Sequence, residues 1–216
     1  MTATYEDVLR FHTHECPGIA VGYRIAELAA QRFGRHSFEN ELVATAETDS
    51  CALDAIQVLT GCTFGKGNLV HVDNGKYTFS FWRRFDGAGI KISARPNGDA
   101  YRDEQTWALY NRIQDGTATG ADRALFSRLQ TARVKRILAA PVEALLVVAE
   151  TTDAMPERHR LKPSAPCAGC GDLTGVDILH DHRGRMLCPP CHLRAHGGVL
   201  PPDHGHHHHS PPQIAS

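Results

Sequence analysis

The sequence has no apolar run approaching the roughly 20 residues that a membrane helix needs. Its first residues, MTATYEDVLRF, lack the basic segment and apolar core of a secretory signal. It also has no excess of either charge, because 23 Lys and Arg stand against 24 Asp and Glu. No global field therefore draws the chain to nucleic acid or to an acidic membrane surface. We expect a soluble, cytoplasmic protein that favours neither partner.

The cysteine content argues against a framework of disulfides. The chain has seven cysteines, an odd number, and four of them form a CxxC…CxxC set. Fourteen histidines are the other unusual count. Metal sites and free thiols in a reducing compartment fit these numbers better than cross-links do. At 216 residues, the chain has room for one sizeable domain and a small second one.

The hydrophobic pattern predicts an α+β domain in which helices flank a mixed or antiparallel sheet. The predicted helices cover residues 5–11, 17–33, 51–60, 103–114 and 121–139. The predicted strands cover residues 41–48, 68–72, 77–84, 89–95 and 143–150, the last of them buried. Thr4 with Asp7, and Ser50, are the expected caps of two helices. Asn74-Gly75 predicts a hairpin between the two strands around it.

Composition divides the chain into four segments. Residues 1–152 form the core domain, and residues 153–166, a polar and basic stretch with prolines, are predicted to be a linker. Residues 167–198 form a module too short to fold on apolar burial alone. Residues 199–216 are an expected disordered tail whose histidines, His204 and His206–His209, suit nickel, zinc or copper. A natural metal-scavenging tail and an expression tag both fit this run, and we favour the former.

The small module is predicted to hold a structural zinc ion. Cys167 and Cys170, then Cys188 and Cys191, offer two pairs of thiolates, which satisfy tetrahedral zinc with no open position. Zinc then supplies folding free energy that so short a segment lacks. Redox-active CxxC pairs are the alternative. Gly184 suits a hairpin between the two pairs. The charges of the module are mixed, so a DNA-binding role is not favoured.

A second group of metal-ligand residues lies in FHTHECPG, residues 11–18. In an extended segment His12, His14 and Cys16 would point to one side, whereas a helical turn would align only His12 with Cys16. Either geometry brings an imidazole and a thiol together, as zinc and other transition metals require. Cys16 and Cys51 each lie at the start of a predicted helix, where the helix dipole favours a thiolate. Core filling by cysteine and a helix-capping His12 are the competing interpretations.

Two stretches, FHTHECPGIAVGYRIAELA and ETDSCALDAIQVLTGCTFGKGNLVHVDNGKYTFSF, resemble the FmdE family, which is named after formylmethanofuran dehydrogenase. That family carries FHGHxCPG, CxxDAIQxxTGCTxGKGN and D-x-GK motifs, and the similarity spans residues 8–95. Thr13 stands where the family usually has Gly. The four-cysteine module, a zinc ribbon or treble clef, resembles the treble-clef finger appended in some members. The resemblance implies an α+β core that forms a homodimer and holds a metal in a cavity.

Carried over residue by residue, the resemblance implies a core metal site of His14, Cys16 and Cys51, with His12 and Asp54 beside them. We expect zinc in the finger and a second transition metal, zinc or nickel, in the core. If the core metal keeps an open position, Cys16, Cys51 and Asp54 are the candidate catalytic residues, with Asp54 as a general base.

Two lysines in glycine-containing turns are candidate ligands for a small anionic molecule. Lys66 lies in GCTFGKGN and Lys76 follows Asn74-Gly75, although plain turns explain both stretches equally well. Three functions remain open. The first is an accessory or metal-handling partner of a redox metalloenzyme, the second is a small metal-dependent enzyme, and the third is a zinc-finger regulator. The number of protein ligands around the core metal separates the first two.

Overall fold

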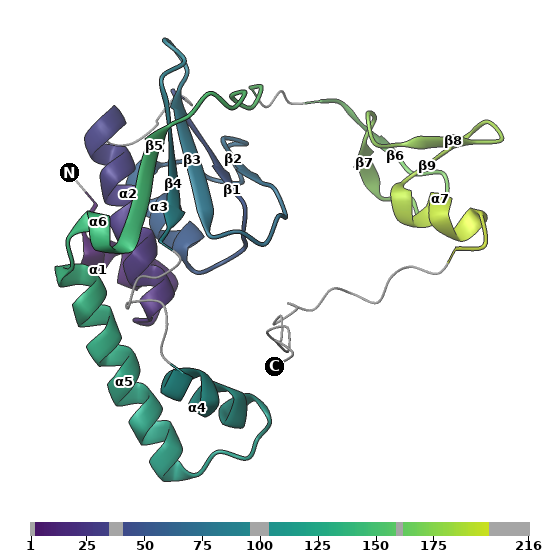
Figure 1. The fold of residues 1–216 in the computed structure, drawn as a ribbon. Coiled ribbons are helices and arrows are strands. Elements are labelled where there is room, and N and C mark those ends of the chain that lie inside the picture. The colour runs from purple at the N-terminus through teal and green to yellow at the C-terminus, as the bar shows by residue number, and fades with distance from the viewer. Residues whose placement is uncertain (1–2, 35–40, 96–103, 159–161, 199–216) are drawn as a thin grey trace, which may run out of the picture. The chain divides into compact units, whose positions relative to one another are not determined.

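The computed structural model describes residues 3–34, 41–95, 104–158 and 162–198. The chain forms two compact units, residues 1–159 and residues 160–216 (Figure 1). The predicted His-rich tail, residues 199–216, lies outside the described residues. In the described part of the chain no helix combines the length and the apolar character that crossing a bilayer requires.

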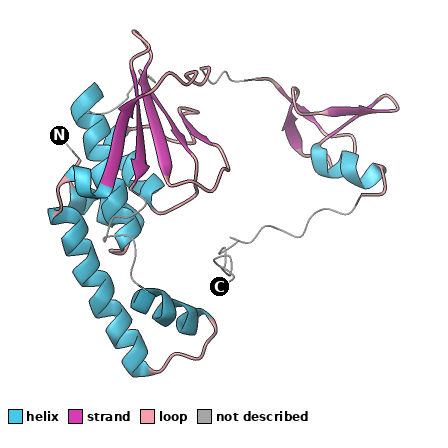
Figure 2. Ribbon diagram, in the orientation of Figure 1, coloured by secondary structure: helices cyan, strands magenta, loops and turns pink. Residues whose placement is uncertain are grey.

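The first unit contains one five-stranded mixed sheet with helices beside it (Figure 2). Its strands are β1 (Leu42–Ala46), β2 (Leu69–His71), β3 (Thr78–Arg83), β4 (Gly89–Ala94) and β5 (Leu146–Glu150). Their order is β2-β1-β3-β4-β5. β1 and β2 pair in parallel, and every other neighbouring pair is antiparallel. The α+β class and the mixed sheet are therefore as predicted.

The helices begin and end close to the positions that local signals predict. They are α1 (Tyr5–His12), α2 (Pro17–Phe33), α3 (Ala52–Thr60), α4 (Glu104–Gln114), α5 (Gly120–Ala139) and the short α6 (Val142–Leu145). Thr4 and Asp7 form the expected reciprocal capping box at the start of α1. α2 starts at Pro17 and ends before Gly34, as its sequence predicts.

One face of the sheet and the N-terminal helices enclose the hydrophobic core. Alternating residues of the strands point to this face and are at most 5% exposed, among them Leu42, Ala44, Phe79, Phe81, Ile90 and Ile92. Ile19, Ile25 and Ile56 from α2 and α3 are fully buried against them. Each such side chain contributes about 1.5–3 kcal/mol through burial. This core holds α2 and α3 side by side along much of their length.

The predicted Asn-Gly hairpin is wrong. β2 and β3 do not pair, because β1 lies between them and bonds to both. Residues 72–77 instead cross over the end of β1, where the Val72 N–H donates to the Ala46 carbonyl at 2.8 Å and the Lys76 N–H to the Glu47 carbonyl at 2.9 Å. Backbone groups of a distant strand therefore satisfy this loop, which a local turn signal cannot reveal.

Two further local predictions need correction. Cys51, not Ser50, occupies the cap position of α3, and the buried Ser50 Oγ makes no hydrogen bond within the described residues. The segment predicted as one buried strand begins as α6, and β5 then forms an edge of the sheet. Val147 and Val148 in β5 are 42% and 45% exposed, because one side of the strand has no neighbour in the described structure.

Part of the predicted linker contacts the core unit. The Arg84 guanidinium donates to the Pro156 carbonyl at 3.1 Å, and Lys91 pairs with Asp153 at 3.1 Å. The second unit contains two small hairpins and a helix: β6 (Ser164–Pro166) with β7 (Leu173–Gly175), β8 (His180–His182) with β9 (Arg185–Leu187), and α7 (Pro189–Ala195). Gly184 has a φ of 78° in the turn between β8 and β9, as the expected hairpin requires.

Candidate metal centres

The starts of α2 and α3 lie side by side because glycines of α2 face α3. A Cβ atom on Gly22 would lie 2.4 Å from the Ala52 Cα, a distance that no folded protein accommodates without movement. A Cβ atom on Gly18 would lie 3.2 Å from the Cys51 Cβ and 3.7 Å from the sulfurs of both Cys16 and Cys51. The two hydrogen-only side chains therefore let two helix-start thiols approach each other.

His12 completes a group of three possible ligands with these thiols. The ligand atoms of His12, Cys16 and Cys51 all lie within 4.8 Å of one another, and each residue is partly buried. The His12 Nε2 lies 3.8 Å from the Cys16 Sγ. A tetrahedral zinc ion with ordinary bond lengths separates a nitrogen and a sulfur ligand by about 3.6 Å. The donor types and their spacing thus fit a transition metal. We call these three residues the core trio.

Asp54 holds the His12 ring in the orientation that a metal site needs. The His12 Nδ1 lies 2.7 Å from the Asp54 Oδ2, so the other ring nitrogen, Nε2, faces Cys16. A carboxylate behind a histidine in this way fixes its tautomer and makes it a better ligand. The His12 side chain is 10% exposed, against 34% for Asp54. Asp54 thus lies where it orients His12, and its role as a general base stays a prediction.

The two thiols of the core trio differ in acidity. A hydrogen bond from the Cys51 thiol, together with the Ile19 N–H and His12, lowers the pKa of Cys16 to about 5 despite its burial. The adjacent Cys16 and burial raise the pKa of Cys51. For His12, burial opposes protonation, but hydrogen bonds to Asp54 and Cys16 outweigh it and raise the pKa. The pair therefore holds one thiolate at neutral pH, and a metal must displace the proton of Cys51.

His14 lies next to the core trio but is not one of its members. Its ring centroid is 4.3 Å from that of His12, with the two planes 35° apart, and the residue is exposed. The reason is the backbone at Thr13, whose φ of 70° ends α1 in the left-handed region. His12 and Cys16 therefore meet without sharing a helical turn, since α1 ends at His12 and Cys16 is the extended N-cap of α2, and Thr13 adopts the conformation that glycine favours.

Two tyrosines border the core trio, and no motif in the sequence indicated them. The Tyr77 hydroxyl donates to the Gly18 carbonyl at 3.5 Å. The Tyr5 hydroxyl donates to Glu15 at 3.4 Å, and burial together with Glu15 raises the pKa of Tyr5. Their distance from Cys16 along the chain hides both from motif analysis. They add polar hydroxyls to the surroundings of Cys16.

The two candidate anion-binding lysines lie at different ends of the core unit. Lys66 follows the C-terminal end of α3, near Cys62, whose pKa is raised to about 11 by burial although the charge of Lys66 opposes this. Cys51 is at the N-terminal end of α3. At a rise of about 1.5 Å per residue, it lies about 13 Å from the C-terminal end of this helix. Lys76 is exposed and lies beside Glu47, at the end of β1 from which the chain runs to Cys51. Lys76 thus lies at the end of β1 that leads to Cys51, whereas Lys66 follows the opposite end of α3.

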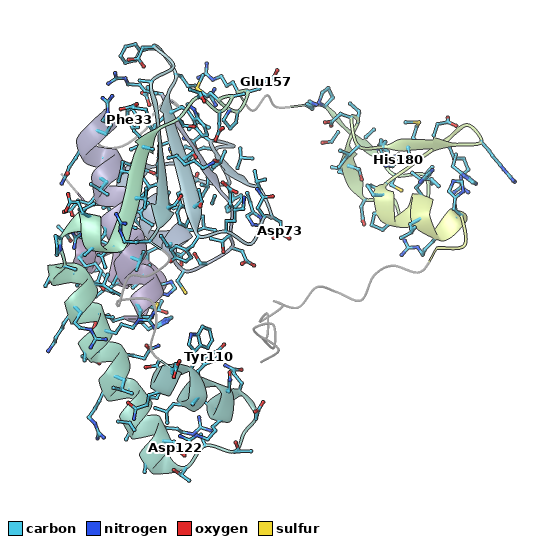
Figure 3. The ribbon with its side chains drawn as sticks, in the orientation of Figure 1. Phe33, Asp73, Tyr110, Asp122, Glu157 and His180 are labelled. Atoms are coloured by element: carbon cyan, nitrogen blue, oxygen red, sulfur yellow. The ribbon has the colours of Figure 1, made fainter. Side chains whose placement is uncertain are left out.

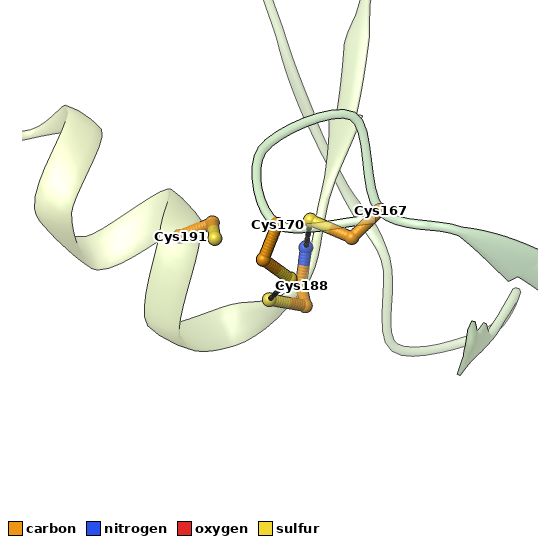
Figure 4. Close-up of side chains that lie close together, drawn as sticks. All are labelled: Cys167, Cys170, Cys188 and Cys191. Atoms are coloured by element: carbon orange, nitrogen blue, oxygen red, sulfur yellow. Dashed lines mark hydrogen bonds between the residues drawn. The ribbon is translucent and has the colours of Figure 1, made fainter. Parts of the chain in front are cut away.

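The four cysteines of the second unit converge on one point (Figure 4). Their sulfurs lie within 4.8 Å of one another, and the Cys170 and Cys188 sulfurs are 3.8 Å apart. Four thiolates around tetrahedral zinc have sulfurs about 3.8 Å apart. The Cys188 N–H donates to the Cys167 sulfur at 3.1 Å and is the main cause that lowers the pKa of Cys167 to about 6. The set therefore has the spacing of a metal site, with Cys167 as an acidic member. Against opposing backbone hydrogen bonds, burial and the neighbouring cysteines raise the pKa of Cys170 and of Cys188.

Small residues and a cation support this four-cysteine set. A Cβ atom on Gly169 would lie 2.9 Å from the Cys191 sulfur, so the first loop needs glycine there. Arg194 donates to the Cys191 sulfur at 3.1 Å, which offsets part of the negative charge of the thiolates. The ligands come from a loop with two glycines and from the start of α7, so neither pair forms the site alone.

Comparison with known proteins gives a consistent result. The model of one protein family, described as "FmdE, Molybdenum formylmethanofuran dehydrogenase operon", matches residues 11–147. A probable S-adenosyl-L-methionine-binding protein of Archaeoglobus fulgidus is 29% identical in an alignment 191 residues long, which covers 84% of this chain and 50% of that protein. The chain thus spans about half the length of this curated relative.

A solved structure has the same fold. It is that of a tungsten formylmethanofuran dehydrogenase FmdE-like protein from Syntrophus aciditrophicus, with a TM-score of 0.56 and 23% identity. The alignment covers 92% of this chain and 96% of that one.

Proposed function

The chain belongs to the FmdE family, and we propose on that premise that it is an accessory protein that binds and hands on a transition metal for a redox metalloenzyme. The family description names the operon of a molybdenum dehydrogenase, which supports a metalloenzyme as the protein partner. The observation that carries the proposal is the core trio itself. Two helix starts and the end of a third helix bring His12, Cys16 and Cys51 together.

The chemistry of the core trio suits a metal that must be released again. Three protein ligands hold zinc or nickel while leaving a coordination position to which an acceptor can bind. The pKa of Cys51 is raised, so protonation of this ligand favours release of the ion. His14 lies next to the trio on the exposed side, where it can serve as a transient ligand.

The four-cysteine set is proposed as a structural zinc site in a treble-clef finger. A loop with two ligands, the β8–β9 hairpin, and a helix whose start supplies Cys188 and Cys191 is the arrangement of that finger. All four thiolates would be ligands of the ion, so the ion would have no open coordination position for catalysis. The seven free cysteines favour the reducing cytoplasm as the location of the protein.

A second candidate function is a small metal-dependent enzyme. It is favoured by the open coordination position and by the Tyr77 hydroxyl near Gly18. A metal there would polarise a bound carbonyl or lower the pKa of a bound water. Cys16, Cys51 and His12 would hold the ion, with Lys76 as the candidate contact for an anionic substrate. The name of the archaeal relative makes S-adenosylmethionine the first small molecule to test by calorimetry.

The protein is also proposed to form a homodimer. β5 is an edge strand with two half-exposed valines, and Trp107 on α4 is 50% exposed. Such edges are covered in most native proteins, and a second copy of the chain is the simplest cover. Light scattering on the full chain should give twice the mass of 23.7 kDa. A single-chain mass would contradict this part of the proposal.

Metal content and exchange test the proposed function. The full chain, with His204 and His206–His209 replaced by Ser, is loaded with zinc and analysed by elemental mass spectrometry. Cys16→Ser and Cys51→Ser should each retain one ion fewer per chain. Cys62→Ser is the matched control, because the buried Cys62 contacts the Leu42 carbonyl and not the core trio. It should retain the full number.

Exchange with isotopically labelled zinc then separates metal handling from a structural role. In the protein that keeps Cys16, the core ion should exchange well before the ion of the four-cysteine set. The core ion is identified as the one that is absent from Cys16→Ser. A core ion that never exchanges would contradict metal handling. Turnover of a substrate at this ion, with no transfer to an acceptor, would favour the enzyme instead.

A further inference from the structure

A third group of metal-ligand residues lies on the second unit, separate from its four cysteines. His180 and His182 are two residues apart on β8, so their side chains point to the same face of the strand. His192 and His196 are four residues apart along α7 and its C-cap, one turn from each other. The hairpin and the helix present these faces to each other, because the His180 and His192 rings stack with their centroids 4.7 Å apart (His180 is labelled in Figure 3).

Three of these rings direct a nitrogen at a common point. The His196 Nε2 lies 3.3 Å from the His182 Nδ1 and 3.2 Å from the His192 Nε2. The three nitrogens lie within 4.8 Å of one another. A tetrahedral ion with metal–nitrogen bonds of about 2.0–2.1 Å separates its nitrogen ligands by about 3.3 Å. The observed spacing is that of ligands around one ion.

Hydrogen bonding alone does not explain this arrangement. A ring nitrogen of neutral imidazole has either one hydrogen or one lone pair in its plane, so it makes one good hydrogen bond. The His196 Nε2 has two neighbours at hydrogen-bond distance, and both are ring nitrogens of other histidines rather than oxygens of a carboxylate or a carbonyl. A shared cation satisfies all three nitrogens at once, whereas hydrogen bonds leave one contact unmatched.

The charges around the three histidines favour an ion that is held loosely. Asp181, next to His182, accepts from the Gly184 N–H in the hairpin turn, and Arg194 donates to Cys191. Among the residues that the structure describes, no carboxylate belongs to the group. Three neutral imidazoles leave the charge of a divalent ion uncompensated, unlike the four thiolates nearby, and they suit zinc, nickel or copper rather than calcium or magnesium. His196 is exposed, so solvent and other ligands reach the site.

We propose that His182, His192 and His196 form an additional, exchangeable site for a divalent transition metal on the finger. The site shares α7 with the four-cysteine set, since Cys191 and His192 are consecutive. An ion bound here ties the β8–β9 hairpin to α7 and leaves an open coordination position at the surface. The proposal does not depend on the core trio or on the function inferred from it.

Equilibrium dialysis of the full chain against Ni²⁺ tests this site. The histidines of the tail are first replaced by Ser at His204 and His206–His209, so that they do not contribute. Cys16→Ser is added to remove the core site from the count. His182→Gln and His196→Asn are compared with His71→Gln, an exposed histidine on β2 of the other unit. Retention of zinc by the four cysteines shows in each sample that the finger is folded.

The expected result is one exchangeable Ni²⁺ per chain beyond the finger ion. Mutation of a residue that hydrogen-bonds to a metal ligand lowers metal affinity roughly 10–100-fold. Loss of a ligand itself should lower the nickel affinity by more than this. His182→Gln and His196→Asn should both show it, with finger zinc retained, and His71→Gln should not. Equal nickel binding by all three variants, or no nickel binding in the parent background, overturns the proposal.

Discussion

Replacing Gly22 by Ala should separate the two thiols of the core trio without touching them. The new Cβ would lie 2.4 Å from the Ala52 Cα and 2.7 Å from the Ala52 carbonyl oxygen. Both are backbone atoms, so no side-chain rotation relieves the contact. α2 and α3 must therefore move apart by about 1 Å to restore ordinary contact distances, which are about 3.5–4.0 Å between carbons. A metal site tolerates deviations of only about 0.2 Å in its bonds.

The magnitude follows from two opposing effects. Overpacking a core costs about 1–3 kcal/mol, and the rigid contact at Ala52 places this variant at the upper end. The better helix propensity of Ala returns about 1 kcal/mol. The net loss should be about 2 kcal/mol, equivalent to a fall in Tm of roughly 4–8 °C for a chain of this size. The core metal should be lost as well, while the finger metal stays.

Tryptophan fluorescence and metal analysis measure these effects separately. The two tryptophans, Trp82 and Trp107, both belong to the first unit, so their fluorescence reports its unfolding alone. Gly120→Ala is the matched control, because a Cβ on this helical glycine meets nothing within 4 Å. It should be as stable as the parent or slightly more stable. Gly22→Ala with the stability of Gly120→Ala and a full metal content would refute the reasoning.

Three further predictions concern the surroundings of the core trio. Thr13→Gly should stabilise the first unit by about 0.5–1 kcal/mol, because threonine at positive φ is strained; denaturant unfolding measures it, and a loss of stability would contradict the strain. Asp54→Asn should weaken core metal binding about 10–100-fold through His12, measured by competition with a chelator, and unchanged affinity would remove Asp54 from the site. In metal-free protein, iodoacetamide should alkylate Cys16 ahead of Cys51 at neutral pH. Because the pKa of Cys16 is lowered to about 5, this rate should fall only as the pH drops through that value, and a midpoint near that of a free thiol would contradict the pairing with Cys51.

Local chemistry predicts the helices of this protein well and the order of its strands poorly. The capping box at Thr4, Pro17 at a first turn and Gly34 at an end act within a few residues, so the sequence alone places α1 and α2. The insertion of β1 between β2 and β3 depends on backbone pairing over more than 20 residues. An Asn-Gly turn signal in the intervening loop therefore indicated the wrong partner for β3.

The candidate sites show the same division between local and distant information. Sulfur at helix starts is a local feature, and it indicated Cys16 and Cys51. The choice between His12 and His14 depended on where α1 ends, which the positive φ of Thr13 decides. The histidine group of the finger was missed. Its signal was present, since two histidines alternate on β8 and two are four residues apart at α7, but only the fold shows that the two faces meet.

Anomalous diffraction at the zinc edge, from crystals of the full chain grown with zinc, tests the central claim most directly. We expect an anomalous peak within about 2.0–2.4 Å of the His12 Nε2 and of the Cys16 and Cys51 sulfurs. A second peak should lie among the four cysteines of the finger. A map with density at the finger and none at the first position, or with Cys16 and Cys51 joined as a disulfide, would contradict the account.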